Sequence, residues 1–494
     1  MLFNSLEFLL FFPIVFIIYA FCPARYRYVW LLVASYFFYM SWDWRYGFLM
    51  LLLTVVTWVS AKLIASIKGK ERRKAALIIS AIVCFGTLFI FKYLDFALMI
   101  IGRLIKIRIV DMTIPQYNII VPVGISFFTF QSFGYVYDVY RGDSPVERNF
   151  LKYALFVSFF PQLIAGPIER TKNLLNQINE IPSSKLMNYQ RITDGLTYML
   201  YGFFLKLVIA DRISILVDTV FNDYLKFGGI ELMVAAAGFS IQIYCDFASY
   251  SIIAIGSAQV MGFNLMENFH APYLSASIKE FWRNWHISLS TWFRDYLYIP
   301  LGGNRKGKLR KYCNLLFVFL ISGLWHGASM HFVIWGGIHG VYQIIGEILT
   351  PVRNEVVKLL RINRKGIIHR SIKIVSTFVL TTIAWVFFRA KSVHMAMDFL
   401  VGIARRLNIW AIWDGTLYKI GLSHYEMNVL LISCIFVLLV DLVLKKKGMR
   451  IDDFLNSQGT LAKDLVIILL ILTIGIYGIY GAGYDAKQFI YFQF

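Results

Sequence analysis

Residues 312–349 read YCNLLFVFLISGLWHGASMHFVIWGGIHGVYQIIGEIL. Apart from its histidines, this stretch has one ionisable side chain with a formal charge, Glu347. A membrane crossing takes about 20 mostly apolar residues, so the stretch is long enough for two shortened passes, with a turn expected near 323–329. Basic residues flank it on both sides, at Lys311 and from Arg353 to Lys373. This pattern predicts that the chain enters and leaves on the same side of the membrane.

Comparable apolar runs occur along the whole chain. Of its 494 residues 58% are hydrophobic and 17% aromatic, and the mean hydropathy is +0.63. These values are typical of membrane proteins. We therefore predict an all-α polytopic membrane protein with roughly 10–12 transmembrane helices. The first run, Leu6 to Phe21, lacks the basic start of a signal peptide, so we expect it to be a retained span.

The basic residues are concentrated in short loops between the apolar runs. A net charge of +20 is compatible with nucleic-acid binding. Lysine and arginine gathered in short loops, however, are the pattern that orients membrane proteins with these loops in the cytoplasm. We assign the loops at 68–74, 305–311 and 445–450 to the cytoplasm. Counting crossings from these loops predicts that both termini lie outside.

The cysteines give no indication of a metal site. The five cysteines lie far apart in the sequence and form no CxxC pair. The ligand spacing of a zinc site is also missing. We therefore expect no metal and no disulfide framework, and interpret the cysteines as small hydrophobic side chains.

Three segments depart from simple apolar helices. Proline and glycine interrupt the runs at 119–140 and 153–168, which predicts broken or re-entrant helices. Irregular backbone at membrane depth is tolerated only where it is buried in protein or lines a wet cavity, so these segments should be central. The segment 267–300 mixes aromatic and charged residues, which is too polar for a span and too aromatic for a solvated loop. We expect an interfacial segment near the cytoplasmic face.

His326 is the most informative single residue. It lies in the sequence SGLWHGAS at 322–329, where hydrocarbon is expected. An ionised side chain at the centre of a span is unfavourable by roughly 2.5–3.5 kcal/mol, so an ionisable residue there is a functional candidate. Histidine can take a proton from a hydroxyl group as its oxygen attacks a carbonyl carbon. A neutral imidazole that is hydrogen-bonded inside the helix bundle fits this sequence context equally well.

Three other histidines lie in or near this region. On an ideal helix His339 points well away from His326, so the histidines form no single ligand stripe. We interpret His331 and His339 as packed, hydrogen-bonded side chains. For His286, an interfacial anchor and a wall of the site or second acid–base group are equally open interpretations.

Several motifs together resemble the membrane-bound O-acyltransferase (MBOAT) family. Within that family the chain is similar to the membrane subunits of bacterial alginate O-acetylation, which are related to those that acylate peptidoglycan and teichoic acid. The motifs occur in the family's order from about residue 120 to 340. They are VGISF at 123–127, FPQLIAGPI at 160–168, DF at 246–247, the segment 282–299, and LWHGA at 324–328.

The resemblance implies a fold and a domain organisation. The MBOAT fold surrounds a central tunnel with transmembrane, re-entrant and interfacial helices. It implies one transmembrane domain over residues 1–494. Within it we expect N-terminal spans at 1–110, a catalytic core at 111–350, and C-terminal spans with an external tail at 351–494.

The resemblance also implies roles for individual residues. His326 corresponds to the family's catalytic histidine, and His286 to a histidine close to the same tunnel. The chain departs from the family's pattern at 248–252 and at Asn284, where a second arginine is usual. These departures affect what can be transferred about substrate or donor contacts near Asp246 and Asn284.

The chain ends in FIYFQF at 489–494. This ending resembles a terminal motif of bacterial cell-surface acylation systems, in which the tyrosine is proposed to accept the acyl group transiently. Tyr491 is therefore a candidate acyl acceptor, with His326 as its base. Aromatic residues also anchor the ends of spans at the membrane interface, and that interpretation stays open.

These features lead to one functional hypothesis. An acyl thioester such as acetyl-CoA enters from the cytoplasm beside the segment 282–296, and His326 directs the acetyl group to an extracytoplasmic polysaccharide. By family analogy we expect a bacterial cytoplasmic (inner) membrane location and a separate extracytoplasmic SGNH-type acetyltransferase as partner. The candidate tunnel or oxyanion contacts are Trp325, Asn284 and Asp246, and the candidate donor contacts are Arg294, Arg305 and Lys306.

Two other classes of function were weighed. A transporter or flippase of lipid-linked saccharides also has many spans and broken central helices, but it predicts internal repeats and midplane ion sites, which the sequence does not indicate. A structural scaffold of a secretion complex would not need His326. The basic loop at 305–311 fits donor phosphate binding and membrane orientation alike.

Overall fold

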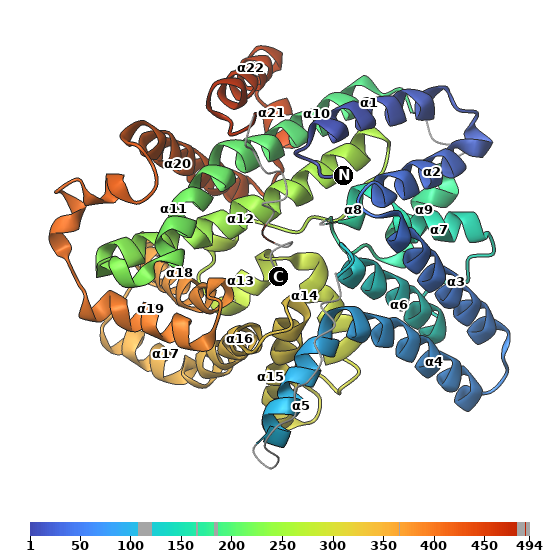
Figure 1. The fold of residues 1–494 in the computed structure, drawn as a ribbon, viewed down its shortest axis with the longest axis horizontal. Coiled ribbons are helices and arrows are strands. Elements are labelled where there is room, and N and C mark those ends of the chain that lie inside the picture. Colours follow the sequence, from blue (N-terminus) through green and yellow to red (C-terminus); the bar gives the residue numbers. More distant parts are fainter. Residues whose placement is uncertain (107–120, 165, 182–185, 365, 482–489, 491–494) are drawn as a thin grey trace. The chain divides into compact units, whose positions relative to one another are not determined.

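The computed structural model describes residues 1–106, 121–164, 166–181, 186–364, 366–481 and 490. Over these ranges the chain forms helices, turns and loops without a β-strand, which confirms the predicted all-α class (Figure 1). The chain divides into two compact units, unit 1 with residues 1–196 and 253–266 and unit 2 with residues 197–252 and 267–494. The expected single transmembrane domain with its three parts stays a prediction.

Unit 1 holds the N-terminal helices. Two helices are shared between the units, because α10 and the long helix α12 each contain a unit border. The helices are α1 Leu6–Phe21, α2 Arg27–Met40, α3 Trp44–Ser66, α4 Lys70–Leu88, α5 Leu94–Lys106, α6 Ile125–Arg141, α7 Phe150–Ser158, α8 Phe160–Leu163, α9 Thr171–Glu180 and α10 Tyr189–Phe204.

The interruption predicted at 153–168 in unit 1 is present between α7 and α8, whereas α6 runs without a break through Gly134. Helix α6 begins after Gly124, whose φ of 75° is in the left-handed region that glycine adopts readily. The break between α7 and α8 leaves the Phe156 carbonyl oxygen to accept hydrogen bonds from Gln131 Nε2 at 2.6 Å and Gln162 Nε2 at 2.8 Å. Most side chains of α6, α7 and α8 are buried. Irregular backbone is thus satisfied inside protein, as the apolar surroundings require.

Unit 2 holds the C-terminal half of the chain. A π-helical turn, Leu205–Ala210, joins α10 to α11, and another, Arg294–Tyr298, follows α14. The helices are α11 Asp211–Asn222, α12 Gly229–Val260, α13 Ile278–Asn284, α14 Ile287–Phe293, α15 Gly307–His326, α16 Met330–Ile348, α17 Thr350–Leu359, α18 Ile367–Arg389, α19 Val393–Arg405, α20 His424–Lys447, α21 Ile451–Asn456 and α22 Thr460–Tyr477.

Six helices in the described part of the chain are long and apolar enough to cross a membrane, and a seventh span is obtained if α16 and α17, bent by 51°, are taken together. The predicted total of roughly 10–12 is larger because it also counted shorter or more polar helices. Helix α1 has only 16 residues, and α15 begins with basic residues. The six are α3, α4 continued to Gly102, α12, α18, α20 and α22.

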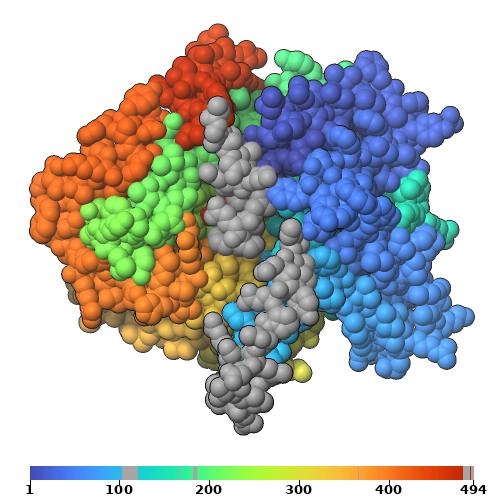
Figure 2. Space-filling model, in the orientation of Figure 1, coloured from blue at the N-terminus to red at the C-terminus, as the bar shows by residue number. Residues whose placement is uncertain are grey.

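Apolar side chains are exposed on helices of both units. Leu10 and Ile14 of α1 and Leu461 and Ile476 of α22 are exposed, and Figure 2 shows part of this outer surface with the N-terminal helices in blue. Of the six candidate spans α12 is the most buried and α22 the least. Exposed apolar side chains on spans of this length suit a hydrocarbon environment.

Helices α15 and α16 form the predicted hairpin, with its turn at Gly327–Ser329 (Figure 1). The two backbones approach closely where each helix has a glycine. A Cβ atom on Gly323 would collide with the carbonyl oxygen of Phe332, and one on Gly336 with the carbonyl oxygen of Phe319. Small residues thus allow the close contact between the two helices.

This contact predicts the effect of one methyl group. Gly336→Ala should destabilise the full-length protein by about 1–3 kcal/mol, since the added carbon overpacks the hairpin. The thermal unfolding midpoint in detergent measures the change. Gly346→Ala in the same helix is the matched control, because a Cβ there has no neighbouring atom within 4 Å. Equal midpoints for the two variants would contradict the close packing.

Candidate active site

His326 is the last residue of α15 and lies inside unit 2, with 6% of its surface exposed. Three aromatic rings from three helices surround it. The ring centroids of Trp325, Trp335 and Phe388 lie 4.9, 5.1 and 5.4 Å from that of His326. The helix ends here because the hairpin turns at Gly327. The imidazole therefore lies at a break in the backbone within an apolar, aromatic interior.

His286 also contacts Trp325. Its ring centroid is 6.1 Å from that of Trp325 and 4.6 Å from that of Phe247. The backbone of His286 has a φ of 42°, a left-handed conformation that is uncommon outside glycine. Asn268 holds this turn through two acceptors, its carbonyl oxygen for Ile287 N at 3.0 Å and Oδ1 for Ser288 N at 3.2 Å. The structure thus brings together the two histidines that the sequence singled out.

The aromatic side chains around His286 are buried in unit 2. Trp282, Trp285 and Trp292 are buried, whereas Arg283 and Arg294 are exposed. The short helices α13 and α14 turn their aromatic side chains into unit 2 and their charges outward, because only the aromatic face can be buried without unpaired charge. The interfacial position expected for this segment stays a prediction.

His331 and His339 have structural partners. The Nδ1 atom of His331 lies 3.1 Å from the Phe387 carbonyl oxygen, and Trp282 Nε1 donates to His339 Nδ1 at 3.2 Å. Both side chains are buried. These contacts fit the interpretation of packed, hydrogen-bonded histidines. His339 also belongs to the same aromatic cluster, since its ring centroid is 5.2 Å from that of Trp335.

Asp246 belongs to a buried charged cluster. Lys206 Nζ lies 2.6 Å from Asp246 Oδ1 and 2.8 Å from Asp211 Oδ1, and all three side chains are almost fully buried. Lys206 and Asp211 are not among the site residues predicted from the sequence. Their presence within the apolar run 193–221 was the available signal, because a charge in such a run needs a partner.

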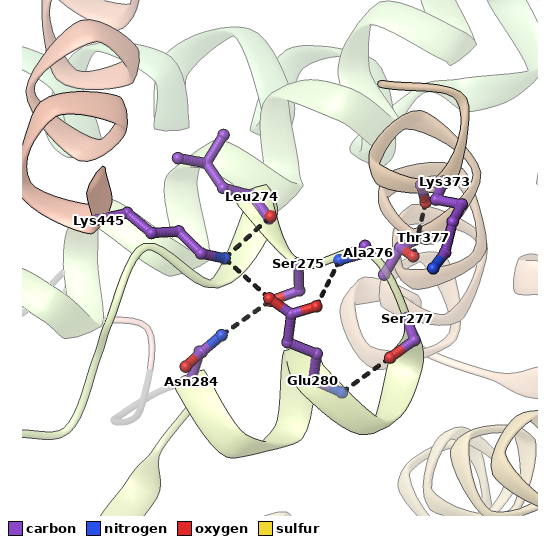
Figure 3. Close-up of polar contacts among 9 residues, drawn as sticks. All are labelled: Leu274, Ser275, Ala276, Ser277, Glu280, Asn284, Lys373, Thr377 and Lys445. Atoms are coloured by element: carbon purple, nitrogen blue, oxygen red, sulfur yellow. Dashed lines mark hydrogen bonds and ion pairs between the residues drawn. The ribbon is translucent and has the colours of Figure 1, made fainter. Parts of the chain in front are cut away.

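Asn284 is engaged by a neighbouring loop (Figure 3). Its Nδ2 donates to Ser275 Oγ at 3.0 Å. In the same group Glu280 accepts from Lys445 Nζ at 3.0 Å and from the Ala276 amide at 2.9 Å. Lys445, one of the basic residues used to assign topology, thus also ties α20 to α13.

The candidate donor contacts lie on the surface of unit 2. Arg294 forms an exposed ion pair with Asp295 at 2.7 Å. Arg305 and Lys306 are exposed and precede α15 directly. Tyr491 lies outside the described residues. Within the described ranges, no three His, Cys, Asp or Glu side chains are close enough to hold a metal ion.

Burial also determines the charge of His286, which lies between α13 and α14 and outside the candidate spans. Removal from water lowers the pKa of His286 from 6.5 to about 3. The imidazole is therefore neutral at cytoplasmic pH. A neutral imidazole can orient a partner by hydrogen bonding, but it carries no positive charge to offer a substrate.

This pKa predicts an acid-sensitive fold. Between pH 6.5 and about 3 the unfolded state binds a proton at His286 that the native state does not, so stability falls as the pH falls through this window. His286→Asn removes the titrating group and keeps a residue type that tolerates left-handed backbone. The unfolding midpoint of His286→Asn should therefore drop less between pH 7 and pH 4.5 than that of the wild type. Parallel curves for the two proteins would contradict a neutral, buried His286.

The fold and the site define a class of protein: a multi-pass helical membrane protein whose interior holds two histidines that contact the same tryptophan. The model of the MBOAT family, described as the membrane-bound O-acyltransferase family, matches residues 37–390. The chain belongs to this family and is an O-acyltransferase.

Three relatives illustrate the similarity. A probable alginate O-acetylase of Pseudomonas syringae pv. tomato is 40% identical over 403 residues, 80% of this chain and 74% of the relative. A probable alginate O-acetylase of Pseudomonas putida is 36% identical over the full length of both chains. A peptidoglycan O-acetyltransferase of Helicobacter pylori is 34% identical over 76% of this chain and 73% of the relative.

Proposed function

We propose that this O-acyltransferase moves an acetyl group from a cytosolic thioester, acetyl-CoA or a similar donor, to a polysaccharide outside the bacterial cytoplasmic membrane, with His326 as the catalytic base. The observation that carries the proposal is the position of His326. It is buried at the turn of the α15–α16 hairpin, among aromatic rings that exclude water. The relatives named for alginate and peptidoglycan acetylation support a polysaccharide acceptor.

The chemistry can proceed in two transfers. In the first, the phenolic oxygen of Tyr491 attacks the thioester carbonyl carbon while His326 takes the phenolic proton. The C–S bond breaks, the thiolate leaves and takes up the proton from His326, and the acetyl group remains as a tyrosyl ester. In the second, an acceptor hydroxyl oxygen attacks that ester, and its proton returns to the phenolate. The same base can also serve a direct attack by the acceptor hydroxyl.

Indole groups can stabilise the developing oxyanion. Trp325 contacts both histidines, and Trp335 lies beside His326. Among the described residues the buried Nε1 of Trp335 has no hydrogen-bond partner. A buried donor held in place near a reacting carbonyl stabilises negative charge without reorganising. Neutral His286 is suited to orienting a hydroxyl rather than supplying charge.

The acceptor chemistry requires a partner. An acetyl group delivered outside the membrane must be placed on a chosen sugar hydroxyl, and we propose that an extracytoplasmic SGNH-type acetyltransferase does this. Family membership favours an acyltransferase over a flippase of lipid-linked saccharides. Alginate, peptidoglycan, acetylated cellulose and teichoic acid share acylatable hydroxyl groups, and the partner selects among them.

His326→Ala should lower transfer from labelled acetyl-CoA by at least about 100-fold, because a general base contributes 10²–10⁴-fold to such reactions. The measurement uses membranes with equal amounts of inserted protein. The matched control is His394→Ala, which removes a histidine whose side chain is 86% exposed. His326→Gln tests the same role with a smaller change in volume. Wild-type transfer by either His326 variant would refute the role of His326 as the catalytic base.

Charge reversal in the loop before α15 should weaken donor binding. Arg305→Glu/Lys306→Glu is expected to raise the KM for acetyl-CoA by about tenfold with little change in kcat, because charged contacts to the donor phosphates are lost. The control is Arg72→Glu/Lys74→Glu, which reverses two exposed charges in the first turns of α4. An unchanged KM in correctly inserted protein would show that residues 305–311 orient the protein in the membrane and do not bind the donor.

A further inference from the structure

The buried cluster of Lys206, Asp211 and Asp246 contains more acid than base. When all three groups are ionised they carry one net negative charge, and their side chains are only 1%, 4% and 2% exposed. The π-helical turn Leu205–Ala210 holds Lys206 within reach of both carboxylates. A buried charge is stable only when hydrogen-bond donors surround it, so the excess negative charge needs donors beyond Lys206.

One of these donors comes from the C-terminal end of the chain. The backbone N–H of Ile490 donates to Asp246 Oδ2 at 2.8 Å, across 244 positions of sequence, and the bond is buried. Ile490 itself is 1% exposed. The two oxygens of the Asp246 carboxylate thus have different partners. Oδ1 pairs with Lys206, and Oδ2 binds the C-terminal segment.

The division of roles within the cluster frees Asp246 for this contact. Lys206 keeps an ion pair with Asp211 at 2.8 Å, so its charge is compensated even without Asp246. A hydrogen bond from a backbone amide to a carboxylate is charge-assisted and about twice as strong as one between neutral groups. Such a contact fixes the main chain of the segment without depending on the side chain at position 490.

The contact also connects to the histidines of unit 2. Asp246 is followed on α12 by Phe247, whose ring centroid is 4.6 Å from that of His286. From His286 the aromatic contacts continue through Trp325 to His326. Ile490 directly precedes Tyr491, the residue proposed as transient acyl acceptor. Phe247 thus adjoins Asp246 in sequence and begins a row of ring contacts that leads to His326, the proposed base.

We propose that Asp246 is a positioning residue: it holds the C-terminal segment through the Ile490 amide and so presents Tyr491 for acyl transfer. This inference rests on the relay in the proposed function. It predicts that losing the Asp246–Ile490 bond releases the segment and slows transfer, while the aromatic site around His326 keeps its structure.

The anchoring itself can be tested without activity. Ile490→Cys keeps the backbone amide and places a thiol at a buried position. In membranes containing the full chain, its labelling by a maleimide, mapped to position 490 by mass spectrometry, should be slow. Adding Asp246→Ala should accelerate labelling at least tenfold, and adding Asp223→Ala, at an exposed position, should not. Equal labelling rates with and without Asp246 would overturn the anchor.

The functional half of the proposal needs a variant that removes only the donor. Ile490→Pro deletes the backbone N–H, since proline has none, and Ile490 belongs to none of the helices α1 to α22. Transfer of labelled acetyl groups to the acceptor should fall at least tenfold. Ile490→Val keeps the amide and is the matched control, with transfer expected within twofold of the wild type. Unimpaired transfer by Ile490→Pro would refute the positioning role even if the anchor exists.

A double variant separates this inference from the relay on which it rests. If Asp246 acts through Tyr491, then Asp246→Ala/Tyr491→Phe should transfer no more slowly than Tyr491→Phe alone. Additive losses would show that Asp246 acts elsewhere and would overturn the inference. Wild-type transfer by Tyr491→Phe would instead refute the relay, and with it the positioning role, while the labelling rates at position 490 would still decide whether the anchor exists.

Discussion

The structure depends on one constraint: a polar group inside an apolar interior must find its partner within the protein. In unit 1 the carbonyl oxygen of Phe156 accepts from two glutamine side chains where the helix breaks. In unit 2 Asn268 satisfies two amides at the turn that carries His286. Irregular backbone is possible at these points because side chains replace the water that a soluble loop would use.

The same constraint shapes the site around His326. Glycines at the α15–α16 contact bring two backbones together, and the hairpin turn leaves the imidazole among indole and phenyl rings. Burial among these rings removes His326 from bulk water. In the proposed function this burial protects the acyl group from hydrolysis. A dry interior and a proton acceptor together suit acyl transfer between two aqueous compartments.

The interior also contains charged side chains. Lys206 and its two carboxylates are compensated by one another and by a backbone amide from near the C-terminus. Breaking a buried pair leaves an uncompensated charge, so such clusters are strongly coupled to their surroundings. The buried cluster thereby connects Ile490 with the interior of unit 2. The Glu280–Lys445 pair, which is only partly buried, joins α20 to α13.

Composition and span length determined the all-α membrane class, because a hydrocarbon environment admits few structures, and the motifs identified the family. The sequence also marked His326, its hairpin and the broken helices through the small and polar residues within apolar runs. It did not reveal that the 282–296 aromatic residues face inward, nor that Lys206 and Asp211 meet Asp246, nor that Ile490 binds there. Those contacts join residues distant in sequence, and only packing selects a partner among many side chains of similar chemistry.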